Sequence, residues 1–170
     1  WQSTLPGFTS GDAVLGDATM HSLEIDGAEM RLFSNGTPRL ISSVNMVANQ
    51  WNHYAVVRSG GSLTVYVNGV IDAGAITAPL PEVFTVAFLG RGPFTGRYAG
   101  GLDELRIWTV ARTPTQLQAF QQVEVAPGSA GLNAYWRFDQ EAGDKVVQDL
   151  SPNLRQGLCG GSLLPEPTDP

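Results

Sequence analysis

The sequence predicts an all-β fold, an antiparallel sandwich of two sheets with one short helix. The chain of 170 residues contains 20 glycines and 11 prolines, which is typical of many short strands joined by tight turns. Apolar and polar residues alternate over several short stretches, and only residues 114–122 have a helical pattern. One domain of this length buries a substantial core.

The clearest hairpin spans residues 51–69, WNHYAVVRSGGSLTVYVNG. Apolar and polar residues alternate from Tyr54 to Arg58 and again from Leu63 to Asn68. Gly60-Gly61 lies between these runs, where a tight turn requires positive φ. Because two strands cannot bury their apolar faces alone, the rest of the chain must supply further strands.

The first forty residues predict further strands. We expect residues 1–3 to be the end of a strand whose beginning is missing, and residues 13–15 to form a short strand. Residues 22–41 alternate in three runs separated by Asp26-Gly27 and Asn35-Gly36, which are strong hairpin turns. This segment is therefore expected to be a three-stranded meander.

The second half of the chain combines strands with the helix. Residues 70–82 are expected to be a surface connection, followed by a strand at 84–88, a loop at 91–98 and a strand at 102–110. Thr113 as N-cap and Pro114 at the first position predict a helix near 114–122. Its Leu117 and Phe120 should face the sandwich.

The tail leaves two alternatives open for the domain organisation. We expect residues 1–126 to form the core of the sandwich and residues 165–170 to be a linker. Residues 127–164 either complete the sandwich or open a second module. The alternating strand 132–139 favours completion, because it would otherwise expose Trp136 and Phe138 on an aggregation-prone edge.

Two motifs together resemble a known family. WNHYAVVR with LTVYVNG is followed by GGLDELRIW, and then by a helix opened by Thr113. From Trp51 to about Gln122 this pattern resembles the laminin-G-like, concanavalin A-like lectin/glucanase modules of extracellular proteins. The resemblance implies a jelly-roll sandwich. It says little about the ligand, because the family includes sugar binders, protein binders and plain spacers.

Charge and composition exclude several partners. The net charge is −6, and the nine arginines and Lys145 are scattered, so nucleic acid and anionic membranes are not expected partners. No apolar run approaches eighteen residues, so membrane insertion is not expected. Cys159 is the only cysteine, so it cannot form an internal disulfide. An extracellular sandwich without disulfides is more typical of a bacterial protein than of an animal one. Since the chain starts at Trp1, we expect a piece of a larger secreted or surface polypeptide.

Among the acidic residues, Asp103 is the strongest candidate for a specific partner. By strand parity it shares a face with Leu105 and Ile107, so it should point inward and need a partner. That partner is either a hydrogen-bonding or ion-pairing group of the protein, or a calcium ion. The resemblance implies the second alternative, since an Asp at the head of this strand often holds structural calcium in such modules. Asp139 is a second candidate if the tail docks beside that strand.

The sequence offers little for catalysis. Glycoside hydrolases of this fold carry acids on alternate positions of one strand, whereas Asp103 and Glu104 are adjacent and should point to opposite faces. His53 is expected to face solvent or cap a turn, and no His/Cys zinc spacing is present. We therefore predict that the protein is not an enzyme.

Ligand binding is predicted in the loop 91–98. Phe94 and Tyr98 offer ring faces, and Arg91 and Arg97 can donate forked hydrogen bonds to a polar or anionic glycan. Tyr54 and Tyr66 are candidate outward-facing rings. Three other rings are expected in the core: Trp51, Trp108 and Trp136.

The predicted function is non-catalytic binding in a secreted or surface protein, with carbohydrate as the leading ligand. The alternatives are a structural spacer or a module that binds an extracellular protein. A glycoside hydrolase with an unfamiliar site is the least favoured alternative.

Overall fold

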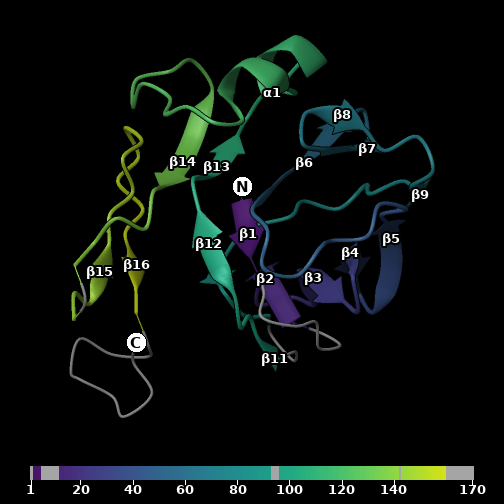
Figure 1. The fold of residues 1–170 in the computed structure, drawn as a ribbon, viewed down its shortest axis with the longest axis horizontal. Coiled ribbons are helices and arrows are strands. Elements are labelled where there is room, and N and C mark those ends of the chain that lie inside the picture. The colour runs from purple at the N-terminus through teal and green to yellow at the C-terminus, as the bar shows by residue number, and fades with distance from the viewer. Residues whose placement is uncertain (1, 5–11, 93–95, 142, 160–170) are drawn as a thin grey trace.

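The computed structural model describes residues 2–4, 12–92, 96–141 and 143–159. The described residues form sixteen strands and one α-helix (Figure 1), so the all-β prediction is confirmed. All but one of the strand pairings are antiparallel, the exception being the short β11 (Gly96–Arg97) against β2 (Asp12–Gly16). Two main sheets face one another across the core.

The larger sheet is built around the predicted meander. Strands β3 (His21–Asp26), β4 (Glu29–Ser34) and β5 (Thr37–Ile41) pair in sequence. Asn35 and Gly36 turn the second hairpin with φ of 51° and 71°, as a two-residue loop requires. The full order is β10-β2-β3-β4-β5-β9, with β10 at Phe88–Leu89 and β9 at Ile76–Thr77.

The smaller sheet contains the hairpin of residues 51–69. Its order is β12-β1-β6-β7-β8, and its strands are β12 (Gly101–Asp103), β1 (Gln2–Thr4), β6 (Asn52–Ser59), β7 (Ser62–Val67) and β8 (Val70–Ile71). Strand β1 pairs with β6 on one side and β12 on the other. The inward side chains of both sheets form one core cluster, whose fully buried members include Val14, Ile25, Met30, Leu40 and Val65.

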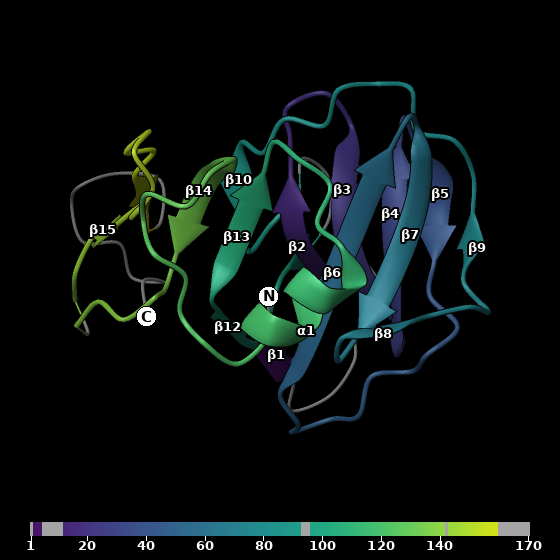
Figure 2. The ribbon, with the colours of Figure 1, turned by 90° about the horizontal axis from the view of Figure 1, so that it is seen from above.

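The tail lies against the sandwich in this structure. Strand β14 (Leu132–Trp136) pairs antiparallel with β13 (Leu105–Trp108). Ala134 and Trp136 belong to the main core cluster, and the Trp136 indole donates to the Arg155 carbonyl at 3.0 Å. The last strands, β15 (Val146–Val147) and β16 (Gly157–Leu158), form a separate pair (Figure 1), and β15 lies on the far side of β14 from β13 (Figure 2). A domain boundary at residue 126 stays a prediction, and the expected linker 165–170 lies outside the described residues.

Two predicted strands are interrupted. Residues 84–88 alternate in burial, but only Phe88–Leu89 forms a strand, paired with Gly16 and Leu15 of β2. The strand expected at 102–110 divides into β12 and β13 at Glu104, which has a φ of 54°. This left-handed residue breaks the side-chain alternation, so strand parity does not relate Asp103 to Leu105.

Helix α1 (Pro114–Phe120) confirms the predicted capping. Thr113 and Gln116 form a reciprocal capping box at its start. The helix contains no buried residue, and Phe120 is 38% exposed. Leu117 and Phe120 line the space between β6 and β13, so both face the sandwich as predicted without being buried in it. The helix packs closely on Gly69, where a Cβ would lie 2.9 Å from Gln118 Cγ.

Candidate functional site

A polar cavity of about 610 Å³ opens where the smaller sheet meets the segment after α1. Four separate parts of the chain form it: the start of β6, the β7–β8 turn, the β12–β13 junction and the segment that follows the helix. Its lining residues are Trp51, His53, Asn68, Asp103, Glu104, Gln121, Gln122, Val123 and Glu124. The lining combines one indole ring with amides, an imidazole and carboxylates, and contains no Lys or Arg.

Trp51 contributes the ring of this cavity. The prediction that Trp51 fills the core is wrong, because 52% of the residue is exposed. Strand β6 starts one residue later, at Asn52, and the pairing with β1 also ends there. No described neighbouring strand therefore covers Trp51. A half-exposed indole beside polar groups offers an apolar face to a ligand.

The Asn68-Gly69 turn forms another wall of the cavity. Asn68 has a φ of 51°, which Asn tolerates better than most residues. Its side-chain oxygen accepts from the His53 backbone N–H at 2.9 Å, and its amide nitrogen donates to Asn52 Oδ1 at 3.2 Å. The close approach of α1 to Gly69, with Gln118 Nε2 donating to the Gly69 carbonyl, places Gln121 near this turn.

His53, in strand β6, also lines the cavity. It is only 9% exposed, so the prediction of a solvent-facing histidine is wrong. Burial is the main cause that lowers the pKa of His53 to about 3, so the ring is neutral. Its Nδ1 has no hydrogen-bond partner among the described residues.

The depressed pKa predicts a pH dependence of stability. The folded state keeps His53 neutral while the unfolded state takes up a proton near pH 6.5, so stability falls as the pH drops below that value. At pH 5 this loss amounts to about 2 kcal/mol. Urea unfolding at pH 7 and pH 5 measures it, and His53→Gln should remove most of the difference. An equal pH difference in both proteins would contradict this assignment.

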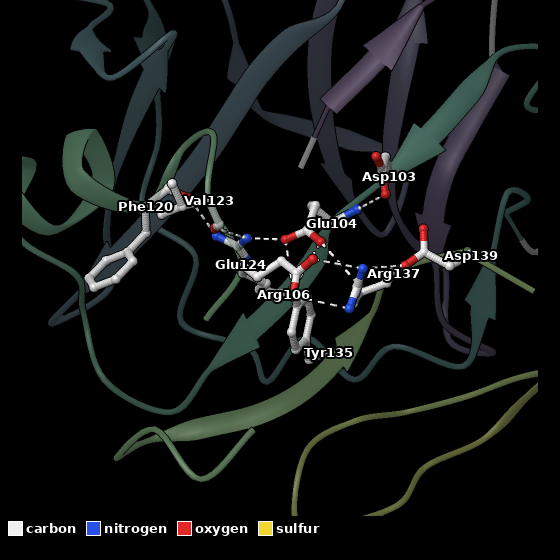
Figure 3. Close-up of polar contacts among 9 residues, drawn as sticks. All are labelled: Asp103, Glu104, Arg106, Phe120, Val123, Glu124, Tyr135, Arg137 and Asp139. Carbon is white, nitrogen blue, oxygen red and sulfur yellow. Dashed lines mark hydrogen bonds and ion pairs between the residues drawn. The ribbon is translucent and has the colours of Figure 1, made fainter. Parts of the chain in front are cut away.

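A charged network supports the wall formed by Glu104 (Figure 3). The Tyr135 hydroxyl donates to the Glu104 carboxylate at 2.8 Å, and Arg106 pairs with the same carboxylate. Burial, followed by the hydrogen bond to Glu104, raises the pKa of Tyr135 to about 12. The non-glycine positive φ at Glu104 costs on the order of 1–2 kcal/mol, which the network must offset.

The same network fixes the segment after α1. Arg106 donates to the carbonyls of Phe120 and Val123, each at 2.6 Å. Arg137 pairs with Glu124 at 2.7 Å and with Asp139 at 2.6 Å. The two arginines therefore neutralise the carboxylates behind the cavity and hold the Gln121–Glu124 segment at its rim.

The two predicted calcium ligands have other partners here. Asp103 Oδ1 accepts from the Glu104 N–H at 2.8 Å, and burial raises the pKa of Asp103. Asp139 faces the Arg137 guanidinium. No group of three or more His, Cys, Asp or Glu suited to a metal occurs within the described residues. The hydrogen bond from the Glu104 N–H is the kind of contact expected of the alternative in which a group of the protein holds Asp103. Calcium binding stays a prediction that melting with and without EDTA would test.

The predicted sugar-binding loop is organised differently. Arg91 and Arg97 are both exposed and their backbones form an isolated bridge, while the Arg91 guanidinium stacks on Phe88 at 4.4 Å. Tyr98 packs against the main core, and burial raises its pKa. Phe94 lies outside the described residues. Of the three predicted residues that the structure describes, it brings the two arginines together at the surface.

The other aromatic predictions have mixed outcomes. Tyr54 and Tyr66 are buried, so neither is an outward-facing ring. Trp136 lies in the core as predicted, and Trp108 packs on a small second cluster with Arg112 at 4.0 Å above its ring. Trp51 is the site residue that sequence reasoning missed, and its place at the very start of a strand was the available signal.

Comparisons with known proteins agree with this fold. Residues 9–118 match the family described as the concanavalin A-like lectin/glucanases superfamily. The chain is 24% identical over 145 residues to human pappalysin-1, an alignment that covers 78% of this chain and 9% of that protein.

A solved structure is also similar. It is described as a "putative carbohydrate binding protein" from Bacteroides ovatus, with a TM-score of 0.70 and 20% identity. The superposition covers 87% of this chain and 47% of that one. Together with the two facing antiparallel sheets, the family match shows that this chain belongs to the concanavalin A-like lectin/glucanase superfamily.

Proposed function

We propose that the protein is a non-catalytic carbohydrate-binding module, and that the cavity beside Trp51 is its binding site. The observation that carries this proposal is the half-exposed Trp51 ring at a polar cavity that His53, Asn68 and Gln121 also line. Sugars present apolar C–H faces and hydroxyl edges, so a ring beside amides and carboxylates matches both. The superfamily, and the description of the Bacteroides ovatus protein, support the same function.

The acids of the site support binding in preference to hydrolysis. A glycosidase needs two carboxyl groups free to exchange protons or attack the sugar. Glu104 is instead held by Tyr135 and Arg106, and Glu124 pairs with Arg137. These contacts give the carboxylates a structural role at the wall of the cavity.

The charge of the cavity favours neutral or amino sugars. Asp103, Glu104 and Glu124 line it without a basic residue, and Arg106 and Arg137 neutralise the two glutamates from behind, so the cavity offers no cation that could pair with an anionic glycan. The alternative site, the loop with Arg91 and Arg97, would favour an anionic glycan instead. The two sites therefore differ in the class of ligand that they select.

A glycan array tests this proposal. The intact chain should bind neutral or amino glycans, and Trp51→Ala should weaken the affinity for the strongest ligand about tenfold or more, or at least ~1.4 kcal/mol. The double variant Arg91→Ala/Arg97→Ala is the matched control and should bind normally. Loss of binding in the control alone would move the site to the loop. An array without ligands would favour the alternative of a spacer or protein-binding module.

We also propose that the module works outside the cell as part of a larger, secreted or surface-anchored bacterial protein. The motifs of this sequence resemble those of modules that belong to extracellular proteins, and this resemblance supports the proposed location. Within the described residues, no helix has the length and apolar character that crossing a membrane demands. Fractionation of the producing cells and detection of the full polypeptide would test this location.

A further inference from the structure

Two Asn-Gly dipeptides form the tips of two-residue hairpins. Asn35-Gly36 joins β4 to β5, and Asn68-Gly69 joins β7 to β8. The φ angles are 51° and 71° in the first turn and 51° and 76° in the second. In both turns the Asn N–H donates to a main-chain carbonyl from an earlier part of the chain, at 3.0 Å and 2.8 Å. The two turns are therefore a matched pair that differs in its surroundings.

Asn-Gly is the dipeptide in which deamidation is easiest, because Gly has no side chain to hinder its own nitrogen. The Gly nitrogen attacks the Asn side-chain carbon Cγ and forms a C–N bond. The side-chain amide leaves as ammonia and takes the proton that the Gly nitrogen loses. Water then adds to either carbonyl carbon of the cyclic imide and breaks its bond to nitrogen, which produces aspartate or isoaspartate. Ring closure therefore requires a free side chain and a peptide that can rotate.

The turn at Asn68 opposes ring closure. The Asn68 side-chain oxygen accepts from the His53 N–H at 2.9 Å, and its nitrogen donates to Asn52 Oδ1 at 3.2 Å. Gly69 is buried, its carbonyl accepts from Gln118 Nε2 at 3.2 Å, and an added Cβ would lie 2.9 Å from Gln118 Cγ. Because rotation of this peptide would disturb the contacts with helix α1, both requirements of ring closure are opposed here.

The turn at Asn35 is open. Asn35 and Gly36 are both exposed, and no hydrogen bond holds the Asn35 side chain to another described residue. A Cβ added to Gly36 would meet no atom within 4 Å, so no packing opposes rotation of this peptide. The Asn35 N–H donates to the Met20 carbonyl, but this N–H takes no part in ring closure. Both requirements of the reaction are met at this turn.

We propose that Asn35 is a site of spontaneous deamidation, and that the folded protein protects Asn68 from the same reaction. Both products add one negative charge to the net charge of −6. In the isoaspartate product the main chain gains an extra atom, at a turn whose length sets the register of β4 and β5. The reaction therefore loosens this hairpin and leaves the cavity wall at Asn68 intact. This inference does not depend on the proposed function.

A time course of the intact chain at mildly alkaline pH tests the proposal. Trypsin places the two positions in separate peptides, residues 32–39 and 59–91, and each peptide contains one Asn and no Gln. Mass spectrometry of these peptides therefore assigns every deamidation to one position. In the folded protein, position 35 should react about tenfold faster than position 68, or more. In urea, where the contacts of Asn68 are lost, the two rates should agree within about threefold.

Three results would count against this account. Equal rates in the folded protein would overturn the proposal. A reaction at position 35 that occurs in urea alone would overturn it as well, because the folded turn would then be closed to the chemistry. A position 68 that stays slow in urea would show that its neighbours in the sequence, and not the folded structure, protect it.

Two variants test the consequence for the hairpin. Asn35→Gln should remove the modification from peptide 32–39, because its longer side chain closes the ring far more slowly. Asn35→Asp adds the same charge without the extra main-chain atom. The isoaspartate form, separated by anion exchange, should therefore melt at a lower temperature than Asn35→Asp. Equal melting temperatures would overturn the loosening of the hairpin.

Discussion

Deletion of residues 127–170 should destabilise the domain by several kcal/mol. The truncated chain loses Ala134 and Trp136 from the main core and leaves β13 without its partner β14. Removal of a buried Trp side chain alone costs about 3–5 kcal/mol, which is a large fraction of the 5–15 kcal/mol typical of a folded domain. Thermal melting followed by circular dichroism measures the loss.

Two point variants make this test specific. Trp136→Ala should reproduce about 3–5 kcal/mol of the loss, whereas Val83→Ala, at a residue that is 77% exposed, should change stability by less than about 0.5 kcal/mol. If the truncated chain keeps the melting temperature of the intact one, the tail belongs to another module, and the domain would end near residue 126.

Glu104→Ala should be the most damaging single substitution in the charged network, with a loss of about 3–5 kcal/mol. The carboxylate is the partner of Arg106, whose side chain is only 8% exposed, and of the Tyr135 hydroxyl. Its removal leaves a buried guanidinium without its counter-charge, and the positive φ at this position is strained for Ala as well. Urea unfolding at pH 7 measures the change.

Glu124→Ala is the matched control for this variant. Glu124 also pairs with Arg137, but its side chain is 62% exposed, against 18% for Glu104. An exposed ion pair contributes about 0–1 kcal/mol, so Glu124→Ala should be nearly neutral. Equal losses in the two variants would show that burial does not distinguish the two carboxylates.

Local patterns predicted the parts of the fold that local interactions determine. The meander of residues 22–41 follows from alternation and two Asn-Gly or Asp-Gly turns, and the helix follows from Thr113 and Pro114. Glu104 could not be predicted in the same way, because a positive φ at a glutamate has no sequence signal. This residue separates β12 from β13, so Asp103 does not share a face with Leu105 by strand parity.

The candidate site was harder to predict than the fold. The cavity joins residues as distant in sequence as Trp51 and Gln122, and no single motif contains them. The loop 91–98 appeared to be a stronger candidate for the binding site, because its arginines and aromatic residues are close together in the sequence. Tyr98 shows the weakness of that reasoning, since its ring packs on the core instead of facing a ligand.

Chemical-shift mapping of the protein with the strongest glycan of the array tests the central claim most directly. If the cavity is the binding site, the indole N–H signal of Trp51 and the side-chain amide signals of Asn68 and Gln121 should move together and saturate with added glycan. The Nε–H signals of Arg91 and Arg97 should stay in place. Shifts confined to those two arginines, with the Trp51 indole unchanged, would contradict the proposed site.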